Sequence, residues 1–128
     1  MTIRVNHPEK LEWRKMGNIQ MGWMREHIHP TELEGHLSFH EAGLDGAMQL
    51  MEMRLNPDTL IAPHSHDEDE IFFVVTGSLC WEDKVLAKGG SLYIPAGTDY
   101  SFRTGSDTAI VLNFRARADH SFNPVGGR

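Results

Sequence analysis

The residues best suited to chemistry in this chain stand between positions 63 and 77, in the segment PHSHDEDEIFFVVTG. His64 and His66 are two residues apart, and Glu70 follows four residues after the second histidine. Side chains alternate between the two faces of an extended strand, so a regular strand would turn all three to one face. Two neutral imidazoles and one carboxylate suit a divalent first-row metal, and binding from one side leaves coordination positions open for a substrate or oxygen. The spacing therefore predicts a metal site formed by His64, His66 and Glu70.

The acidic run DEDE at positions 67–70 admits other interpretations. Acidic runs are typical of solvated turns, and in such a turn His64 and His66 would be ordinary loop residues. A β-bulge in the run would disturb the alternation and leave open whether Glu68 or Glu70 faces the metal. Regular alternation selects Glu70.

A second segment, GGSLYIPAG at positions 89–97, is expected to form a turn, a short apolar strand and another turn. Together the two segments resemble the cupin family, whose first motif runs HxHxxxE and reaches Gly after six more residues, and whose second runs GxxxxxPxG. The matching residues are His64, His66, Glu70 and Gly77 in the first motif and Gly89, Pro95 and Gly97 in the second. The resemblance covers roughly the C-terminal two thirds of the chain, also favours Glu70 as the acidic ligand, and implies a divalent transition metal: Fe, Mn, Ni or Zn.

Three positions depart from the family pattern, one of them Thr104, where cupins usually carry Asn. Cupins usually carry Gly six residues before the first histidine, where this chain has Asp58, and a further histidine three residues after the second motif, where it has Tyr100. Three roles are open to Tyr100: a metal ligand through its phenol oxygen, a proton donor beside the metal, or a barrel-lining aromatic residue with a hydrogen-bonded hydroxyl. Tyr100 is the candidate catalytic residue.

The elements that must position these residues are short strands. From Ala47 onward, apolar and β-branched runs alternate with Gly, Pro and Asn turns, which predicts an all-β fold. The run 71–76 is expected to be a strand buried on both faces. The expected architecture is a double-stranded β-helix, the jelly-roll or cupin barrel, over residues 47–118, with a C-terminal tail at 119–128.

Residues 1–46 are interrupted so often by Gly and Pro that no long helix can run through them. An irregular arm with short strands is predicted, whose apolar side chains pack on the barrel or on a partner subunit. The resemblance implies a homodimer paired through such N-terminal strands.

Strand parity also predicts the lining of the site. Phe72 shares parity with Glu70, and Phe102 shares parity with Tyr100, so both are candidate substrate contacts in an apolar cavity. Arg115 on the last strand is a candidate for holding a substrate carboxylate, because guanidinium geometry matches that group.

Composition excludes several classes of protein. The chain has 128 residues, a net charge of −6 and no basic patch, so neither nucleic-acid nor membrane binding is expected. Its single cysteine, Cys80, excludes an intrachain disulfide. The N-terminal residues lack the apolar stretch of a signal peptide, and a cytoplasmic location is expected.

Besides His7, four histidines precede the barrel, at positions 27, 29, 36 and 40, and could compete for the metal role. His27 and His29 repeat the HxH spacing, but Pro30 follows at once. His36 and His40 are four apart, but the first lacks the adjacent Glu of a zinc-protease HExxH helix. All four are predicted to be surface or hydrogen-bonded histidines.

The predicted function is that of a metalloenzyme acting on a small oxygenated or carboxylated molecule. Two histidines and one carboxylate suit Fe(II) and O₂, which favours dioxygenase-type cleavage over lyase or isomerase chemistry. The alternative is a non-catalytic cupin that binds or senses a ligand or metal, and the replacement of the fourth ligand by Tyr100 supports it.

Overall fold

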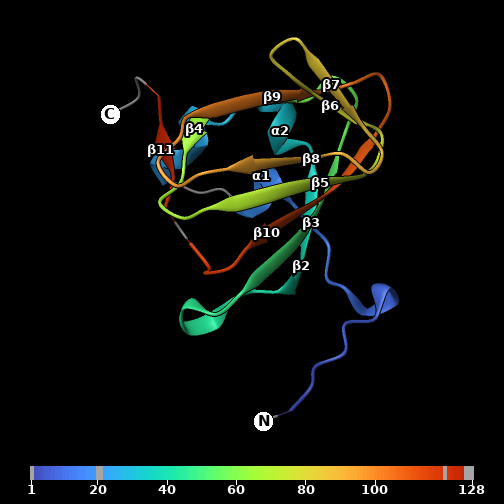
Figure 1. The fold of residues 1–128 in the computed structure, drawn as a ribbon, viewed down its shortest axis with the longest axis vertical. Helices are drawn as coiled ribbons and strands as arrows, with labels where there is room; N and C mark the ends of the chain where they lie inside the picture. Colours follow the sequence, from blue (N-terminus) through green and yellow to red (C-terminus); the bar gives the residue numbers. More distant parts are fainter. Residues whose placement is uncertain (1, 20–21, 120, 126–128) are drawn as a thin grey trace.

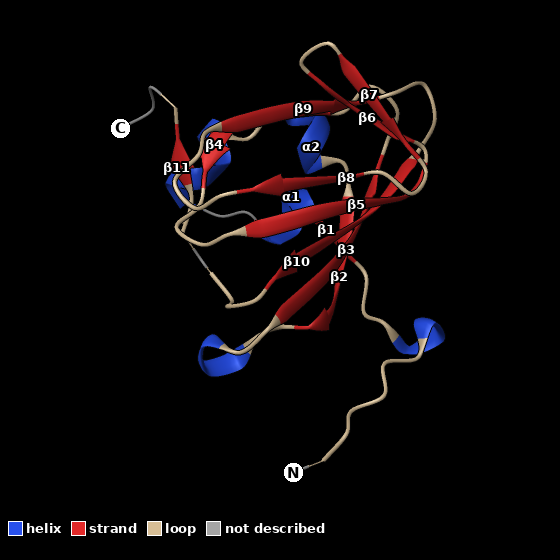
Figure 2. Ribbon diagram, viewed as in Figure 1, coloured by secondary structure: helices blue, strands red, loops and turns tan. Residues whose placement is uncertain are grey.

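Two antiparallel β-sheets make up most of the structure, a computed structural model that describes residues 2–19, 22–119 and 121–125 (Figures 1 and 2). One sheet has the order β1-β2-β3-β10-β5-β8 and the other the order β11-β4-β9-β6-β7. The strands of the first sheet are β1 (Arg14–Lys15), β2 (His36–Glu41), β3 (Gln49–Leu55), β10 (Ala109–Arg115), β5 (Glu70–Thr76) and β8 (Ser91–Ile94). Those of the second are β11 (Asn123–Pro124), β4 (Leu60–Ser65), β9 (Tyr100–Thr104), β6 (Ser78–Trp81) and β7 (Lys84–Ala87).

From β3 onward the chain passes from one sheet to the other at nearly every connection, the β6–β7 hairpin excepted. This alternation is the arrangement of a jelly roll, and it confirms the predicted all-β barrel. Helical structure is confined to short pieces: η1 (Pro8–Lys10), α1 (Met16–Ile19), η2 (Gly22–His27), α2 (Pro30–Leu33) and η3 (Leu44–Gly46). Among the described residues no helix is long and apolar enough to cross a membrane.

The core lies between the two sheets and follows from strand parity. Along β5 the inward side chains are Glu70, Phe72 and Val74, and along β9 they include Tyr100 and Phe102, as parity predicted. Leu55, Val74, Leu79 and Val111 have no exposed surface and form the dry part of this core. Asn113 and Arg115 continue the buried face of β10, so one end of the barrel interior is polar.

The outer face of β5 is not buried. In the single chain, Ile71 is 39% exposed and Phe73 is 41% exposed. The prediction that this strand is buried on both faces is therefore wrong. Across the sheet Ile71 pairs with Tyr93 on β8 and with Phe114 on β10, both also exposed. The outer face of the six-stranded sheet therefore carries a row of apolar side chains.

Gly77 and Asp58 both stand in turns that require a positive φ. Gly77 joins β5 to β6 with φ +76°, and a Cβ there would lie 2.6 Å from the carbonyl oxygen of Thr108, so only glycine fits. Asp58, at the position where cupins usually carry Gly, also has a positive φ of 55°. Because Asp tolerates the left-handed region better than most residues, it can replace Gly in this turn.

The N-terminal residues divide into two parts. Residues 2–13 lie outside the barrel without a strand of their own (Figure 1), and they contact it where Arg4 and Asn6 bond to Glu41 and where Arg54 lies over the Trp13 ring. β1 pairs with β2 and β2 with β3, so this part of the predicted arm extends the six-stranded sheet. At the other end of the chain, β11 pairs with β4 and brings residues 121–125 back beside the strand that carries His64.

Candidate metal and substrate site

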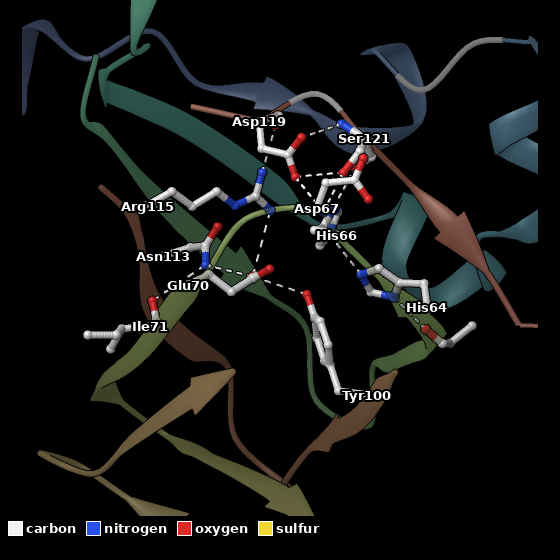
Figure 3. A network of polar contacts seen from close by, with 11 residues as sticks. His64, His66, Asp67, Glu70, Ile71, Tyr100, Asn113, Arg115, Asp119 and Ser121 are labelled. Atoms are coloured by element: carbon white, nitrogen blue, oxygen red, sulfur yellow. Dashed lines mark hydrogen bonds and ion pairs between the residues drawn. The ribbon is translucent and has the colours of Figure 1, made fainter. Parts of the chain in front are cut away.

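His64 and His66 meet at one end of the barrel, where β4 leaves its sheet. His64 is buried near the end of β4, opposite Tyr100 in the register of β4 and β9, and His66 follows in the connection to β5. The two Nε2 atoms lie 3.0 Å apart, and Figure 3 shows the rings directed toward one another. The predicted convergence of the two imidazoles is therefore present.

The other ring nitrogens define which tautomer each histidine adopts. Nδ1 of His64 lies 2.7 Å from the carbonyl oxygen of Ala62, and Nδ1 of His66 lies 2.5 Å from that of Ser121. A carbonyl oxygen can only accept, so both Nδ1 atoms carry a proton and both Nε2 atoms carry a lone pair. Burial lowers the pKa of both imidazoles to about 4, so both rings are neutral at pH 7.

Two lone pairs facing each other at 3.0 Å repel unless a cation lies against both. Metal-bound histidines show this arrangement, with one nitrogen donating to a carbonyl and the other directed at the ion. The residues present therefore fit a divalent transition metal. His64 and His66 would hold it through Nε2.

Glu70 lies beside the histidine pair in a buried polar network (Figure 3). Its Oε1 accepts hydrogen bonds from the Tyr100 hydroxyl and from Asn113 Nδ2, both at 3.1 Å, and Nη2 of Arg115 lies 3.6 Å away. Its Oε2 is buried without a hydrogen-bond partner in the described part of the chain. Because an unpaired buried carboxylate oxygen is costly, Oε2 is suited to a bound cation or substrate.

The three predicted ligands do not lie on one regular strand. β4 ends at Ser65 and β5 begins at Glu70 in the opposite sheet, so the chain crosses the end of the barrel between them. In the described residues, no group of three or more His, Cys, Asp or Glu side chains is arranged to hold a metal ion. The histidines form a two-nitrogen site with Glu70 adjacent to it, and the three-ligand set stays a prediction.

Tyr100 is a neutral phenol in this arrangement. Burial, together with the charge of Glu70, raises its pKa well above the ordinary value of 10.0. Its hydroxyl donates to Glu70, and its ring lies 4.5 Å from the His64 ring, centroid to centroid. Tyr100 is thus a protonated donor next to both groups that would surround a metal.

Arg115 is buried and joins Glu70 to the C-terminal segment. Its Nη1 donates to the carbonyl oxygen of Asp119 at 2.9 Å, and its Nε is buried without a partner among the described residues. Phe72 and Phe102 line the same cavity as Arg115, as strand parity predicted. Whether these three residues contact a substrate stays a prediction.

Asp119, Ser121 and Phe122 complete the site and could not be assigned to it from the sequence. The Asp119 carboxylate accepts from Ser121 N and Oγ and from Asp67 N, at 2.6 to 3.0 Å. Burial alone would raise the pKa of Asp119, but these hydrogen bonds outweigh it and lower the pKa. This Asx turn holds the Ser121 carbonyl against His66, although more than fifty residues separate them in the chain.

The cavity beside these groups has a volume of about 300 Å³, which is the lower end of the range for small-molecule sites. Its walls are mostly apolar and come from both sheets and from the N-terminal helical pieces. The apolar lining residues are Met16, Ile19, Met24, Ile28, Leu37, Phe39, Met51, Met53, Ile61, Phe72, Phe102 and Phe122. The polar lining residues are Glu32, Gln49, His64, His66, Tyr100, Asn113, Arg115, Asp119 and Ser121.

His29, His36 and His40 are hydrogen-bonded or surface histidines, as predicted. His29 caps α2, accepting a hydrogen bond from Thr31 N, and His40 pairs with Glu52 at 2.9 Å. His36 is exposed, and His27 packs edge-on against Trp23.

The family described as "Cupin domain" matches residues 51–114, which is half of the chain and includes His64, His66, Glu70 and Tyr100. No curated protein matches the sequence.

Several solved structures resemble the chain. An RmlC-like cupin protein from Ralstonia eutropha JMP134 has a TM-score of 0.71 and 14% identity, covering 91% of this chain and 70% of that one. The polyketide cyclase RemF from Streptomyces resistomycificus has a TM-score of 0.70 and 22% identity, covering 98% and 86%. A Bacillus subtilis oxalate decarboxylase with Mn(II) centres has a TM-score of 0.59 and 20% identity, covering 71% of this chain but 28% of its own. At these identities the likeness shows a shared fold.

Proposed function

The chain belongs to the cupin family, and on that basis we propose that it is a metal-dependent enzyme acting on a small organic molecule with an apolar body and an oxygen-bearing or carboxylate group. The observation that carries this proposal is the pair of facing Nε2 atoms of His64 and His66, 3.0 Å apart, with both Nδ1 atoms committed to carbonyl oxygens. A purely structural pair would be expected to share a proton between the two rings.

Glu70 is the proposed third ligand, through the oxygen that has no partner. Arg115, Asn113 and Tyr100 all approach its other oxygen, so they fix the carboxylate while leaving Oε2 free among the described residues. When bound, Fe(II) would supply O₂ activation, whereas Mn, Ni or Zn would polarise a carbonyl or hydroxyl.

The chain's own residues would bind and orient the substrate. The apolar walls exclude water and take the body of the molecule, with Phe72 and Phe102 on one side. Arg115, whose Nε has no partner in the described structure, would hold a carboxylate or other anionic oxygen. Tyr100, a neutral phenol, would donate a proton or hydrogen bond to an oxygen of the substrate.

Dioxygenase-type cleavage is the first reaction class that we propose, because two histidines and one carboxylate in a dry cavity suit Fe(II) and O₂. The similar solved structures include a cyclase and a decarboxylase, so the fold alone does not choose the reaction. Metal-assisted proton transfer, as in a lyase or isomerase, is the second candidate. The hydrogen bond from Tyr100 to Glu70 favours it, because the pair could move a proton.

Metal analysis after purification without chelator tests the proposal. We expect about one divalent metal ion per chain in the wild type, and less than a tenth of that in His64→Ala and Glu70→Ala. His36→Ala, which changes an exposed histidine, is the control and is expected to keep its metal. A wild-type protein that takes up no Fe, Mn, Ni or Zn contradicts the proposal.

Oxygen uptake with the Fe(II)-loaded protein tests the reaction class. Candidate diketones, phenols and thiols are the substrates, and consumption of O₂ by the wild type but not by His64→Ala is the expected result. Product formation without O₂ consumption supports proton transfer instead. Stoichiometric metal with no turnover across the panel supports a cupin that only binds or senses a ligand.

A further inference from the structure

We propose that Glu32 is a substrate-contacting residue of the cavity, and that it selects molecules carrying a second hydroxyl or carbonyl oxygen besides the one that faces the histidine pair. This proposal rests on the proposed function of the same site and names the class of substrate that the site takes. Glu32 lies in a short turn-like segment far from the cupin motifs, so nothing in the sequence pattern predicts that it lines the cavity.

Glu32 lines the wall of the cavity that the N-terminal segment contributes. Met16, Ile19, Met24 and Ile28 supply the other side chains of this wall, and all four are apolar. Among the described lining residues before position 60, Glu32 is the only one that can ionise. An acid in such a wall would be replaced by an apolar residue without loss of packing if it had no further role.

The helix that carries Glu32 is fixed in place. His29 caps the first turn of α2, and the hydroxyl oxygen of Thr31 accepts a hydrogen bond from the backbone N–H of Leu60 at 2.9 Å. Leu60 begins β4, the strand that carries His64. Glu32 is therefore positioned relative to the histidine pair by the same strand, and its side chain is not part of a fraying end.

Glu32 is half-buried, and no structural partner among the described residues explains that position. Within the described part of the chain, no donor lies within hydrogen-bond distance of its carboxylate and no cation pairs with it. Its neighbour Glu34 differs, because it is exposed and pairs with Lys15 at 2.9 Å. Burial raises the pKa of Glu32 to about 7, which shows how weakly the surrounding protein solvates its charge. Its charge also helps raise the pKa of Tyr100, so the two groups act on the same space.

The chemistry of an unpartnered carboxyl defines what it would bind. The protonated form donates a hydrogen bond to a carbonyl, and the ionised form accepts one from a hydroxyl. The rest of the wall takes apolar or aromatic groups, for which the methionine side chains are adaptable contacts. The favoured substrate is therefore a cyclic or aromatic molecule with two oxygen functions, one toward His64 and His66 and the other toward Glu32.

Ligand-observed NMR and calorimetric titration with matched probe pairs test this. The probes are 2-naphthol with its dihydroxynaphthalene isomers, and cyclohexanone with the 1,3- and 1,4-cyclohexanediones, each added to metal-free and Zn(II)-loaded protein. We expect at least one dioxygenated probe to bind the wild type about 10-fold more tightly than its mono-oxygenated counterpart, the effect of one well-placed hydrogen bond to a buried group. Glu32→Leu should lose this preference, whereas Glu32→Gln should keep most of it.

Glu34→Gln is the matched control and should bind every probe as the wild type does. If Glu32→Leu does not fold, Glu32→Ala gives the same comparison by removing atoms only. A panel in which no pair shows a stronger preference in the wild type than in Glu32→Leu or Glu32→Ala overturns the proposal, and so does a panel in which nothing binds. A wild type that shows the Glu32-dependent preference but takes up no metal leaves this proposal standing and removes the proposed metalloenzyme.

Discussion

Burial gives the Glu32 carboxyl a pKa of about 7 in the folded protein, against an ordinary value of 4.5. Between these two values the folded protein binds more protons than the unfolded chain, so stability falls as pH rises through this window. The protonated carboxyl contributes about 3 kcal/mol to the free energy of unfolding. This contribution is complete below about pH 4.5 and is lost above about pH 7. His64 and His66, whose pKa values are lowered to about 4, act in the opposite direction in both proteins, so the test is a difference: in urea unfolding, the stability of the wild type relative to Glu32→Gln should be lower at pH 8 than at pH 5. Equal pH dependence in the two proteins would contradict the assignment.

Tyr100 allows a second test at the level of one residue. Tyr100→Phe removes the hydroxyl that donates to Glu70 but leaves the Asn113 hydrogen bond to the same oxygen. We expect unchanged metal content, a loss of about 1 kcal/mol in stability, and turnover lower by about 100-fold. Atomic absorption and oxygen uptake measure the first and last of these. Lost metal would instead identify Tyr100 as a ligand, and unchanged turnover would leave it a structural role only.

At this scale the sequence predicted the histidine pair well, because HxH spacing next to a strand limits where two imidazoles can point. It did not predict the protonation of the pair, which depends on the carbonyl oxygens of Ala62 and Ser121. It also missed Glu32, because the burial of an acid in a short helix depends on elements that pack against it from elsewhere in the chain.

Among the elements, the turn in which Asp119 binds Ser121 has the clearest effect on the site, because it holds the Ser121 carbonyl against His66. Asp119→Ala removes the acceptor of three hydrogen bonds that fix this turn. We expect Zn(II) affinity to fall about 10- to 100-fold, as is typical when a group that orients a metal-binding histidine is lost. Competition titration against a chromogenic chelator measures it. Asp107→Ala, at an exposed turn, is the control, and equal affinities in all three proteins would contradict this role.

The strands could be predicted because their alternation and their Gly and Pro turns are local signals. The strand register could not be predicted from these local signals. The register brings Tyr100 opposite His64 and Glu70 opposite Ile94. The expectation that His64, His66 and Glu70 share one strand failed for the same reason, since the chain crosses between sheets at that point.

For the whole molecule, we propose that the exposed row on the outer face of the six-stranded sheet, rather than the N-terminal strands that the resemblance implied, pairs two chains in a homodimer. Ile71, Phe73 and Tyr93 are 39%, 41% and 62% exposed, and contiguous exposed apolar side chains of this kind mark association surfaces. Light scattering after size exclusion should give about twice the chain mass of 14.5 kDa. Ile71→Glu combined with Phe73→Glu should give monomers, whereas Val85→Glu, an exposed residue of the other sheet, should not. A monomeric wild type would contradict the dimer.

The central claim is that His64 and His66 hold a divalent metal through their facing Nε2 atoms. Anomalous scattering at the zinc absorption edge, from crystals grown with excess Zn(II), tests it most directly. We predict a single strong peak about 2.0 to 2.1 Å from both Nε2 atoms, with a Glu70 oxygen within about 2.2 Å. No anomalous density between the two imidazoles, with their Nε2 atoms still 3.0 Å apart or turned away from each other, would contradict the account.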